Sequence, residues 1–286
     1  MCLVSRVFSR LLLLLVLLLA LPVIAGERGL LWKVQPAQGA PSYLFGTIHT
    51  HDARVTNFSP QLLKAIDSAE VFMPEAMPPA DPAMMFMARG TLKDLLSPQE
   101  TEVLLRLADA YALRDSIALR MKPWLLAVVL AQPSASGLLF QDLQLMEIAN
   151  GKGKTVEALE QPEAHFGAMD SLEMSEQLAL LRATMKQSQE EKEQDFETLI
   201  KAYLTRDVEN IAALDEKLSS SGLPSGLWPK IRKMLIEERN ARMAERLVAR
   251  MQQNSVFVAV GAAHLPGTDG LVARLRAAGF KVEAVE

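Results

Sequence analysis

One four-residue pattern, Gly-x-x-His, occurs twice and constrains the fold more than any other feature of the sequence. It stands at 46–49, behind the apolar run 42–45, and again at 261–264, behind the apolar run 256–260. Each copy predicts a buried strand, a glycine that allows another segment to approach closely, and a histidine where the strand ends. Open α/β sheets place their ligand sites just outside the ends of strands, so a sheet that holds both strands would bring the two histidines into one site.

The expected elements come in the order strands, helices, strands. Strand-like runs lie at 30–34, 42–48, 71–73 and 155–159, and near the end of the chain at 256–260 and 281–285. Helical patterns fill most of the part between, beginning with the capping box of Ser97 and Glu100. We therefore expect an α/β fold whose sheet is built from both ends of the chain, with a large helical insertion at about 97–253.

The first 25 residues have the pattern of a signal peptide. Arg6 and Arg10 precede the aliphatic run 11–21, and small residues end at Ala25, where we expect cleavage. The run is short for a spanning helix, which needs about 20 apolar residues. We interpret the protein as exported, periplasmic or secreted, with its folded domain at 26–286. The alternative is an uncleaved segment that anchors the chain in the membrane, which would then be its only membrane contact.

Charge, cysteine content and serine context argue against several classes of protein. The formal net charge of −4 gives no basic face for nucleic acid. The only cysteine, Cys2, precedes the hydrophobic run and would leave with it, so the exported chain would have no disulfide. A metal site would then use His, Asp or Glu. No serine lies in a nucleophile-elbow pattern, so a serine hydrolase is not supported.

Three strand ends carry side chains suited to chemistry. His49 and His264 end the two Gly-x-x-His patterns, and Glu75 follows the short apolar run 71–73. Neutral imidazole binds divalent metals or acts as a base, and a carboxylate binds metal or activates water. Each residue also has a structural interpretation: a histidine that only satisfies local hydrogen bonds, or a glutamate that caps a loop. Both interpretations stay open on the sequence pattern alone.

Arg239 and Asn240 lie on the helix expected at 228–253, on flanks shared with apolar residues. A buried arginine needs a carboxylate or a substrate anion, so Arg239 is a candidate catalytic residue. The alternative is a side chain that reaches solvent along the helix. Asn240 would hold Arg239 in place or contact the substrate.

Two further histidines and a methionine-rich stretch complete the candidates. His51 forms a His-x-His pair with His49, but the loop expected there makes it an outer or exposed residue, with a substrate contact as the alternative. His165 lies in a polar helical segment and is assigned no role. Residues 77–87 would pack on the core as a loop or form an adaptable rim for an apolar ligand.

Four segments taken together resemble the TraB/GumN family, which includes the Tiki-type proteins: 43–49, 71–75, 238–244 and 258–267. The similarity extends over about 31–285. It implies a mixed sheet formed from two related halves, similar to those of erythromycin esterases and the haem-binding ChaN proteins. Tiki-type members are membrane-associated metalloproteases that depend on divalent ions such as manganese or cobalt.

The resemblance implies a specific set of site residues. His49, His264 and Glu75 would bind the divalent ion, and Glu75 and Arg239 would take part in catalysis. The chain departs from the family pattern at Met77, where an acid often follows the glutamate by two residues, and at His51, which is usually not histidine. The first departure bears on the geometry of the metal site.

Two hypotheses follow for the function. The first is an exported hydrolase, most simply a peptidase, that uses manganese, cobalt or zinc. The second is a non-catalytic binding protein whose pocket captures a peptide or a small ligand such as haem; because fold similarity does not fix function, the resemblance alone does not decide between them.

Overall fold

We describe the protein from a computed structural model, which covers residues 28–133 and 140–286. The signal peptide expected at 1–25 lies outside the described residues. Within the described ranges, no helix combines the length and the apolar composition needed to cross a membrane. The limits expected for the domain and for its helical insertion stay predictions.

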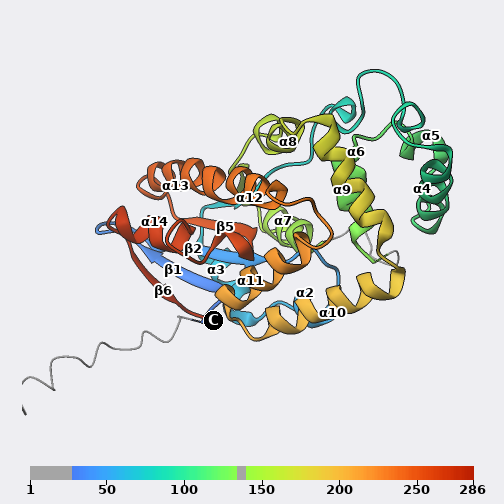
Figure 1. The fold of residues 1–286 in the computed structure, drawn as a ribbon. Coiled ribbons are helices and arrows are strands. Elements are labelled where there is room, and N and C mark those ends of the chain that lie inside the picture. Colours follow the sequence, from blue (N-terminus) through green and yellow to red (C-terminus); the bar gives the residue numbers. More distant parts are fainter. Residues whose placement is uncertain (1–27, 134–139) are drawn as a thin grey trace, which may run out of the picture.

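Among the described residues, six strands form one sheet in the order β4-β3-β5-β2-β1-β6. They are β1 (Leu31–Gln35), β2 (Ser42–Thr47), β3 (Val71–Pro74), β4 (Thr155–Val156), β5 (Val256–Gly261) and β6 (Lys281–Ala284). The strands β4, β3, β5 and β2 are parallel, whereas β1 is antiparallel to both β2 and β6. Figure 1 shows the blue N-terminal and red C-terminal strands side by side, which confirms the α/β class and a sheet that joins both ends of the chain.

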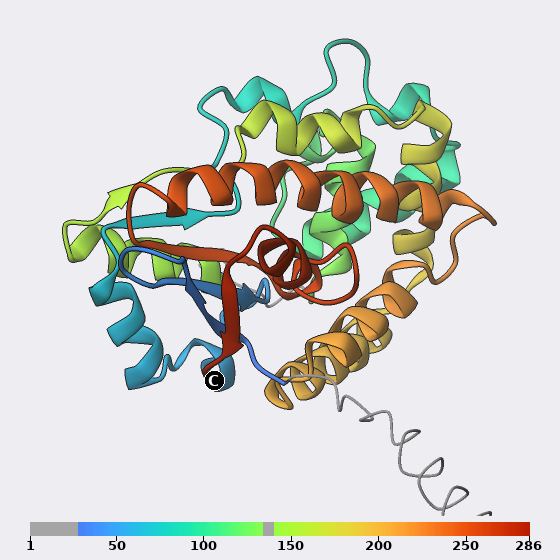
Figure 2. The ribbon, with the colours of Figure 1, turned by 90° about the vertical axis from the view of Figure 1, so that its left-hand side faces the viewer.

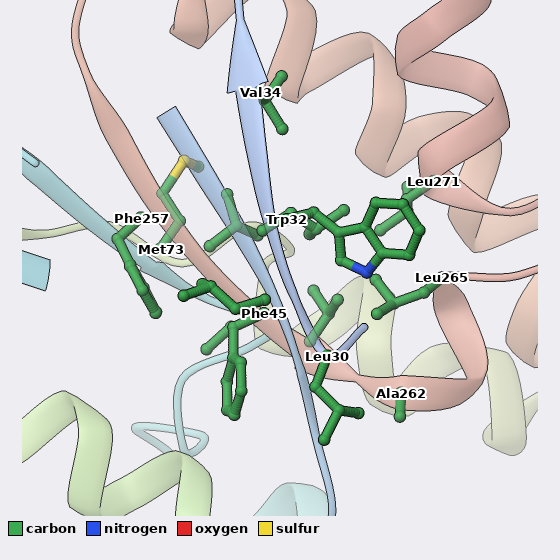
Figure 3. Close-up of a cluster of buried hydrophobic side chains, with 14 of the residues drawn as sticks. Leu30, Trp32, Val34, Phe45, Met73, Phe257, Ala262, Leu265 and Leu271 are labelled. Carbon is green, nitrogen blue, oxygen red and sulfur yellow. The ribbon is translucent and has the colours of Figure 1, made fainter. Parts of the chain in front are cut away.

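The central strands β2 and β5 align the two Gly-x-x-His patterns. Their register pairs Tyr43 with Phe257 and Thr47 with Gly261. Five of the six residues of β5 are buried, as is typical of a strand covered on both faces of a parallel sheet. Figure 3 shows Phe45 and Phe257 on one side of the strands and Trp32 on the other, so both faces of the sheet pack against apolar layers.

Helices cover both faces of the sheet. On one face, α3 (Pro60–Ser68) connects β2 to β3, and α7 (Gln141–Gly151) leads to β4. On the other, α13 (Glu238–Met251) leads into β5 and packs against α14 (Leu271–Ala277). Right-handed crossovers between parallel strands produce this division, because the chain moves along the sheet in opposite directions before and after β4. Figure 2 shows α13 lying along its own face of the sheet.

A helical part lies beside the sheet, with α6 packed against α9 around a second apolar core. Its helices are α4 (Pro98–Ala110), α5 (Asp115–Ala118), α6 (Pro123–Ala131), α8 (Pro162–Asp170) and α9 (Met174–Lys186). The helices α10 (Gln189–Leu204) and α11 (Val208–Ser219) instead add buried side chains to the core of the sheet, and the short α2 (Ala53–Thr56) follows β2. Residues 174–219 form three helices, because Ser188 and Glu191 form a capping box at the start of α10 and Asp207 caps α11.

The long helix expected at 228–253 contains an irregular turn. It consists of α12 (Leu227–Arg232), a π-helical turn η3 (Lys233–Glu237) and α13. A π-helical turn inserts one extra residue and is frequent at functional sites. Here it immediately precedes Arg239 and Asn240, so it sets the direction in which both side chains leave the helix.

Candidate metal centre

The candidate site lies where four parallel strands end at one edge of the sheet. The neighbouring strands β3, β5 and β2 lead to Glu75, His264 and His49, and β4 leads to Glu160. β4 is shorter than the strand expected at 155–159, but hydrogen bonds continue beyond it. Glu160 N donates to Glu75 O at 2.9 Å, which holds the two acids side by side. The expectation that the three strand ends are neighbours on one edge is confirmed.

Arg239 lies between the two glutamates. Its Nε donates to Glu160 Oε2 at 2.7 Å, and its Nη2 forms ion pairs with Glu160 and with Glu75 Oε1. Its Nη1 donates to the carbonyl of Leu235 at 3.2 Å. The side chain is 5% exposed, so the charge needs these two carboxylates. The sequence indicated that a buried Arg239 needs an anionic partner, and the structure provides two carboxylates.

His165 completes this cluster, although the sequence analysis assigned it no role. Its Nδ1 lies 2.9 Å from Arg239 Nη2. Because arginine can only donate, His165 accepts at Nδ1 and the proton of its neutral ring lies on Nε2. The helix α8 brings His165 to the site, and its position depends on how α8 packs. No pattern in the sequence indicates this. Glu160 carried a signal, since it follows a strand-like run as Glu75 does.

Burial and charge oppose each other at the two glutamates. Burial raises the pKa of Glu75, but the charges of His264 and Arg239 outweigh it and hold the pKa well below its ordinary value. Burial likewise raises the pKa of Glu160, but the charge and hydrogen bond of Arg239 outweigh it and lower the pKa below its ordinary value. Both acids are therefore ionised at neutral pH.

Asn240 fixes the orientation of His264. The Asn240 amide nitrogen donates to the carbonyls of His264 at 3.3 Å and Asp269 at 3.0 Å, which turns its Oδ1 toward His264 Nδ1, 2.7 Å away. His264 therefore donates from Nδ1, and only Nε2 is left for a proton or a metal ion. That nitrogen lies 3.6 Å from Glu75 Oε1. Two ligands of one tetrahedral ion with bonds of about 2.1 Å lie about 3.4 Å apart, so the pair fits a shared cation.

Residues at the start of α7 hold the loop of His49. Gln141 Oε1 accepts from Ile48 N at 2.9 Å. Asp142 accepts from Thr47 Oγ1 at 2.5 Å and lies 3.1 Å from His49 Nδ1. Asp142 raises the pKa of His49 to about 9. The His49 side chain is 63% exposed, and its Nε2 is left for another partner.

Two arrangements of metal ligands compete at this edge. Ligand atoms of Glu75, Glu160 and His165 lie within 4.8 Å of one another, a spacing that could hold an ion. Arg239 Nη2 contacts all three, so an ion could enter there only if the guanidinium moved away. At the pair of Glu75 and His264, Arg239 Nη2 contacts Glu75 Oε1, but no contact between Arg239 and His264 is found among the described residues. This pair is the better candidate centre.

The remaining sequence candidate, His51, is exposed in the loop before α2, as the sequence suggested.

Known proteins resemble this chain over most of its length. A model of the TraB/PrgY/gumN family matches residues 30–284. The chain belongs to the TraB/PrgY/gumN family. The resemblance seen in the sequence is thereby confirmed over nearly all of the described residues.

Two relatives of this TraB/PrgY/gumN protein carry a functional name. Metalloprotease TIKI1 of Danio rerio is 26% identical over 312 aligned residues, which cover 88% of this chain and 62% of the relative. Metalloprotease TIKI2 of Xenopus tropicalis is 28% identical over 333, which cover 92% of this chain and 63% of the relative. The chain thus spans less than two thirds of either relative. No solved structure matches it.

Proposed function

We propose that this protein is an exported, divalent-metal-dependent hydrolase that cleaves peptide bonds. The observation that carries the proposal is the pair of His264 Nε2 and Glu75 Oε1, 3.6 Å apart, with the other nitrogen of His264 engaged by Asn240. Outer partners that fix the ring of a metal-binding histidine are typical of metal sites. The two relatives named as metalloproteases support the same class of reaction.

The residues fit a divalent ion of the manganese, cobalt or zinc type. Glu75 and His264 would hold it. His49 belongs to no group of three ligand atoms within 4.8 Å among the described residues, so its ring would have to move closer to supply a third ligand through Nε2. A bound ion would polarise the substrate carbonyl and lower the pKa of a bound water. Both histidines have an oxygen acceptor on Nδ1, Asn240 for His264 and Asp142 for His49. The mixed sheet agrees with a relationship to erythromycin esterases and ChaN proteins, which stays part of the proposal.

Glu75 is better suited to charge balance than to proton transfer. An efficient general base has a pKa near the working pH, whereas the pKa of Glu75 is held well below its ordinary value. Glu75 Oε2 also accepts from Gly261 N at 2.9 Å, so the carboxylate is held at both oxygens. We assign Glu75 the role of metal ligand.

Arg239 is better suited to positioning than to substrate contact. Its Nε and Nη2 are directed to Glu75, Glu160 and His165, and its side chain is almost fully buried. Little donor capacity is left for a substrate oxyanion. We assign it the role of holding Glu75 ionised and correctly oriented beside His264.

A peptide-cleavage assay on the purified protein tests the proposal. Chelator treatment should abolish cleavage of a peptide library, and added manganese, cobalt or zinc should restore it. Glu75→Gln and His264→Ala should lose activity at every metal concentration, whereas His51→Ala, in the same loop region as His49, should keep it. Activity that survives both substitutions would overturn the assignment.

A second experiment tests export. N-terminal sequencing of protein from an extracytoplasmic fraction should find a start at or near Gly26, as cleavage after Ala25 requires. An intact Met1 in the membrane fraction would show an uncleaved anchor instead.

Binding without catalysis is the second candidate function. A cavity of about 650 Å³ that reaches Asn240 and Ala263 supports it, because a pocket of that size can hold a ligand whether or not the ligand reacts. Saturable peptide binding by a protein whose histidines bind no metal would favour this function.

A further inference from the structure

A large cavity lies between the helical part and the site. Its volume is about 650 Å³, within the range of roughly 300 to 1,000 Å³ typical of ligand pockets. Most of its wall is apolar and comes from α6, α9 and the segment containing α12 and η3. The lining includes Trp124, Met169, Leu180, Leu223, Ile231 and Leu235.

The cavity reaches the candidate metal centre from the side of the second Gly-x-x-His pattern. Its lining includes Ala263, next to His264, and Asn240, which orients His264, so the cavity ends beside the centre, and His264 and Glu75 themselves do not line it. The helix α11 packs against η4 (Ala262–His264) and contributes Asp215 to the wall. The charged cluster of Glu75, Glu160 and Arg239 does not line it. A molecule in the cavity would therefore approach the site along His264.

Asp215 is the unusual polar group of this wall. It is half-buried, and no hydrogen bond or ion pair to its carboxylate is found among residues 28–133 and 140–286. Burial raises the pKa of Asp215, and the charges of His49 and His264 partly oppose the rise. A half-buried carboxylate without a partner is costly, so a cation that entered the cavity would gain from pairing with it.

Other charged groups of the wall already have partners. Glu216 lies 3.3 Å from Arg232, and Asp269 lies 3.0 Å from Arg274. Glu209 is exposed on the first turn of α11. Asp215 is therefore the carboxylate that an incoming cation would meet inside the cavity.

We propose that this cavity binds the substrate through an apolar peptide segment that carries a basic side chain, with the basic group paired to Asp215. The proposal rests on the proposed peptidase function and adds its substrate preference. The apolar wall would take the neighbouring side chains, and Asp215 would select a lysine or arginine over a neutral or acidic residue. A half-buried charge pair of this kind separates cationic from neutral ligands by about tenfold or more.

Binding of two matched peptides to the metal-free protein tests the proposal without requiring catalysis. The probes are an acetylated, amidated tripeptide of two leucines and a lysine, and its analogue with norleucine in place of lysine. Calorimetry should show the lysine peptide binding at least about tenfold more tightly. Asp215→Asn should reduce the ratio to below about twofold, and Glu209→Gln, an exposed neighbour on the same helix, should leave it unchanged.

The folded state of Asp215→Asn is checked by its melting temperature. Because the pKa of Asp215 is raised on folding, its ionisation opposes folding at neutral pH. The variant should therefore unfold at the same or a higher temperature than the natural protein. A second variant, Ala212→Phe, places a large side chain on the cavity wall and should weaken both peptides equally.

The outcomes separate this proposal from the proposed function. Equal binding of the two peptides, or a preference that survives Asp215→Asn, overturns the substrate preference. Cleavage of a peptide library with no bias toward basic residues overturns it while leaving the hydrolase standing. Selective binding of the lysine peptide without any cleavage supports the preference and contradicts the hydrolase.

Discussion

The two Gly-x-x-His patterns end neighbouring strands, yet their surroundings differ. At the first, an added Cβ on Gly46 would lie 2.7 Å from Leu265 Cδ1 and 3.1 Å from Ala262 Cα, so the glycine is needed for close packing. At Gly261 an added Cβ would meet nothing closer than 3.6 Å. His264 is buried and faces the amide of Asn240, whereas His49 is largely exposed and faces the carboxylate of Asp142.

The difference shows which properties the pattern determines. It places a histidine just beyond a buried strand in both copies, because the strands are parallel and in register. Protonation is set by neighbours from outside the pattern. His264 donates to the amide oxygen of Asn240, so Glu75 decides whether its Nε2 carries a proton or binds a metal ion. His49 faces the carboxylate of Asp142, which favours the charged form of its ring. The two histidines should therefore respond differently to substitution and to pH.

The largest expected effect on stability comes from substituting the buried side chain of Arg239. Arg239→Met leaves Glu75 and Glu160 without their shared counter-charge and should lower the free energy of unfolding at pH 7 by about 3 to 5 kcal/mol. Urea denaturation measures it. Arg242→Met is the matched control, because Arg242 is on the same helix and 3.8 Å from Glu160 but is 51% exposed. It should change stability by less than about 1 kcal/mol.

The pH dependence of the Arg239 effect has a definite sign. The pKa of Glu75 is lowered in the folded protein from 4.5, so its contribution to stability is present above pH 4.5 and is lost as pH falls below it. Without Arg239 both acids should protonate more readily. The loss caused by Arg239→Met should therefore be smaller at pH 4.5 than at pH 7, and an equal loss at both would contradict the buried charge cluster.

The next largest effect is a difference in stability between substitutions of the two histidines. His264→Ala leaves Asn240 Oδ1 without its buried donor and should lower the free energy of unfolding by about 1 to 3 kcal/mol. His49→Ala should cost less than about 1 kcal/mol, because the His49 side chain is largely exposed. Thermal or urea denaturation of both variants at pH 7 gives the comparison. Similar losses would mean that the two patterns are structurally equivalent after all.

Substitution of Asn240 should weaken metal binding more than it lowers the stability of the fold. Asn240→Leu removes the acceptor that orients His264 and should weaken manganese binding by about 10- to 100-fold in calorimetry. Asn240→Asp keeps an acceptor oxygen but loses the donors to the carbonyls of His264 and Asp269, so it should restore only part of the affinity. An unchanged affinity in Asn240→Leu would show that the metal does not bind through His264.

The smallest effect is a titration of His49 in the metal-free protein. Nuclear magnetic resonance should find its pKa near 9, and Asp142→Asn should bring it down toward 6.5. Because the pKa is raised on folding, the pair stabilises the protein below pH 6.5 and loses this contribution as pH rises through about 9. A value near 6.5 in the natural protein would remove the distinction between the two patterns.

The sequence predicts the strand ends well and the helical contributions poorly. His49, Glu75 and His264 follow apolar runs, and parallel strands bring such positions to one edge by geometry alone. His165 and Asp142 reach the site from helices α8 and α7, whose places depend on packing between segments far apart in the chain. No local sequence pattern indicates how these helices pack.

Arg239 shows a second limit. Its helix and its apolar flank are visible in the sequence, but the π-helical turn before it is not, since α- and π-helical turns share residue preferences. That turn decides the direction of the side chain. The carboxylates that neutralise Arg239 come from the residue after β3 and from the segment after β4, so the need for an anionic partner was predictable and the meeting of these two carboxylates was not.

Anomalous diffraction from crystals grown with manganese tests the central claim most directly. The account predicts one strong peak within bonding distance of His264 Nε2 and Glu75, with Arg239 still lying between Glu75 and Glu160. A peak among Glu75, Glu160 and His165, with the Arg239 guanidinium displaced, would contradict the assigned centre. The absence of any peak at the strand ends would contradict the metal-dependent function itself.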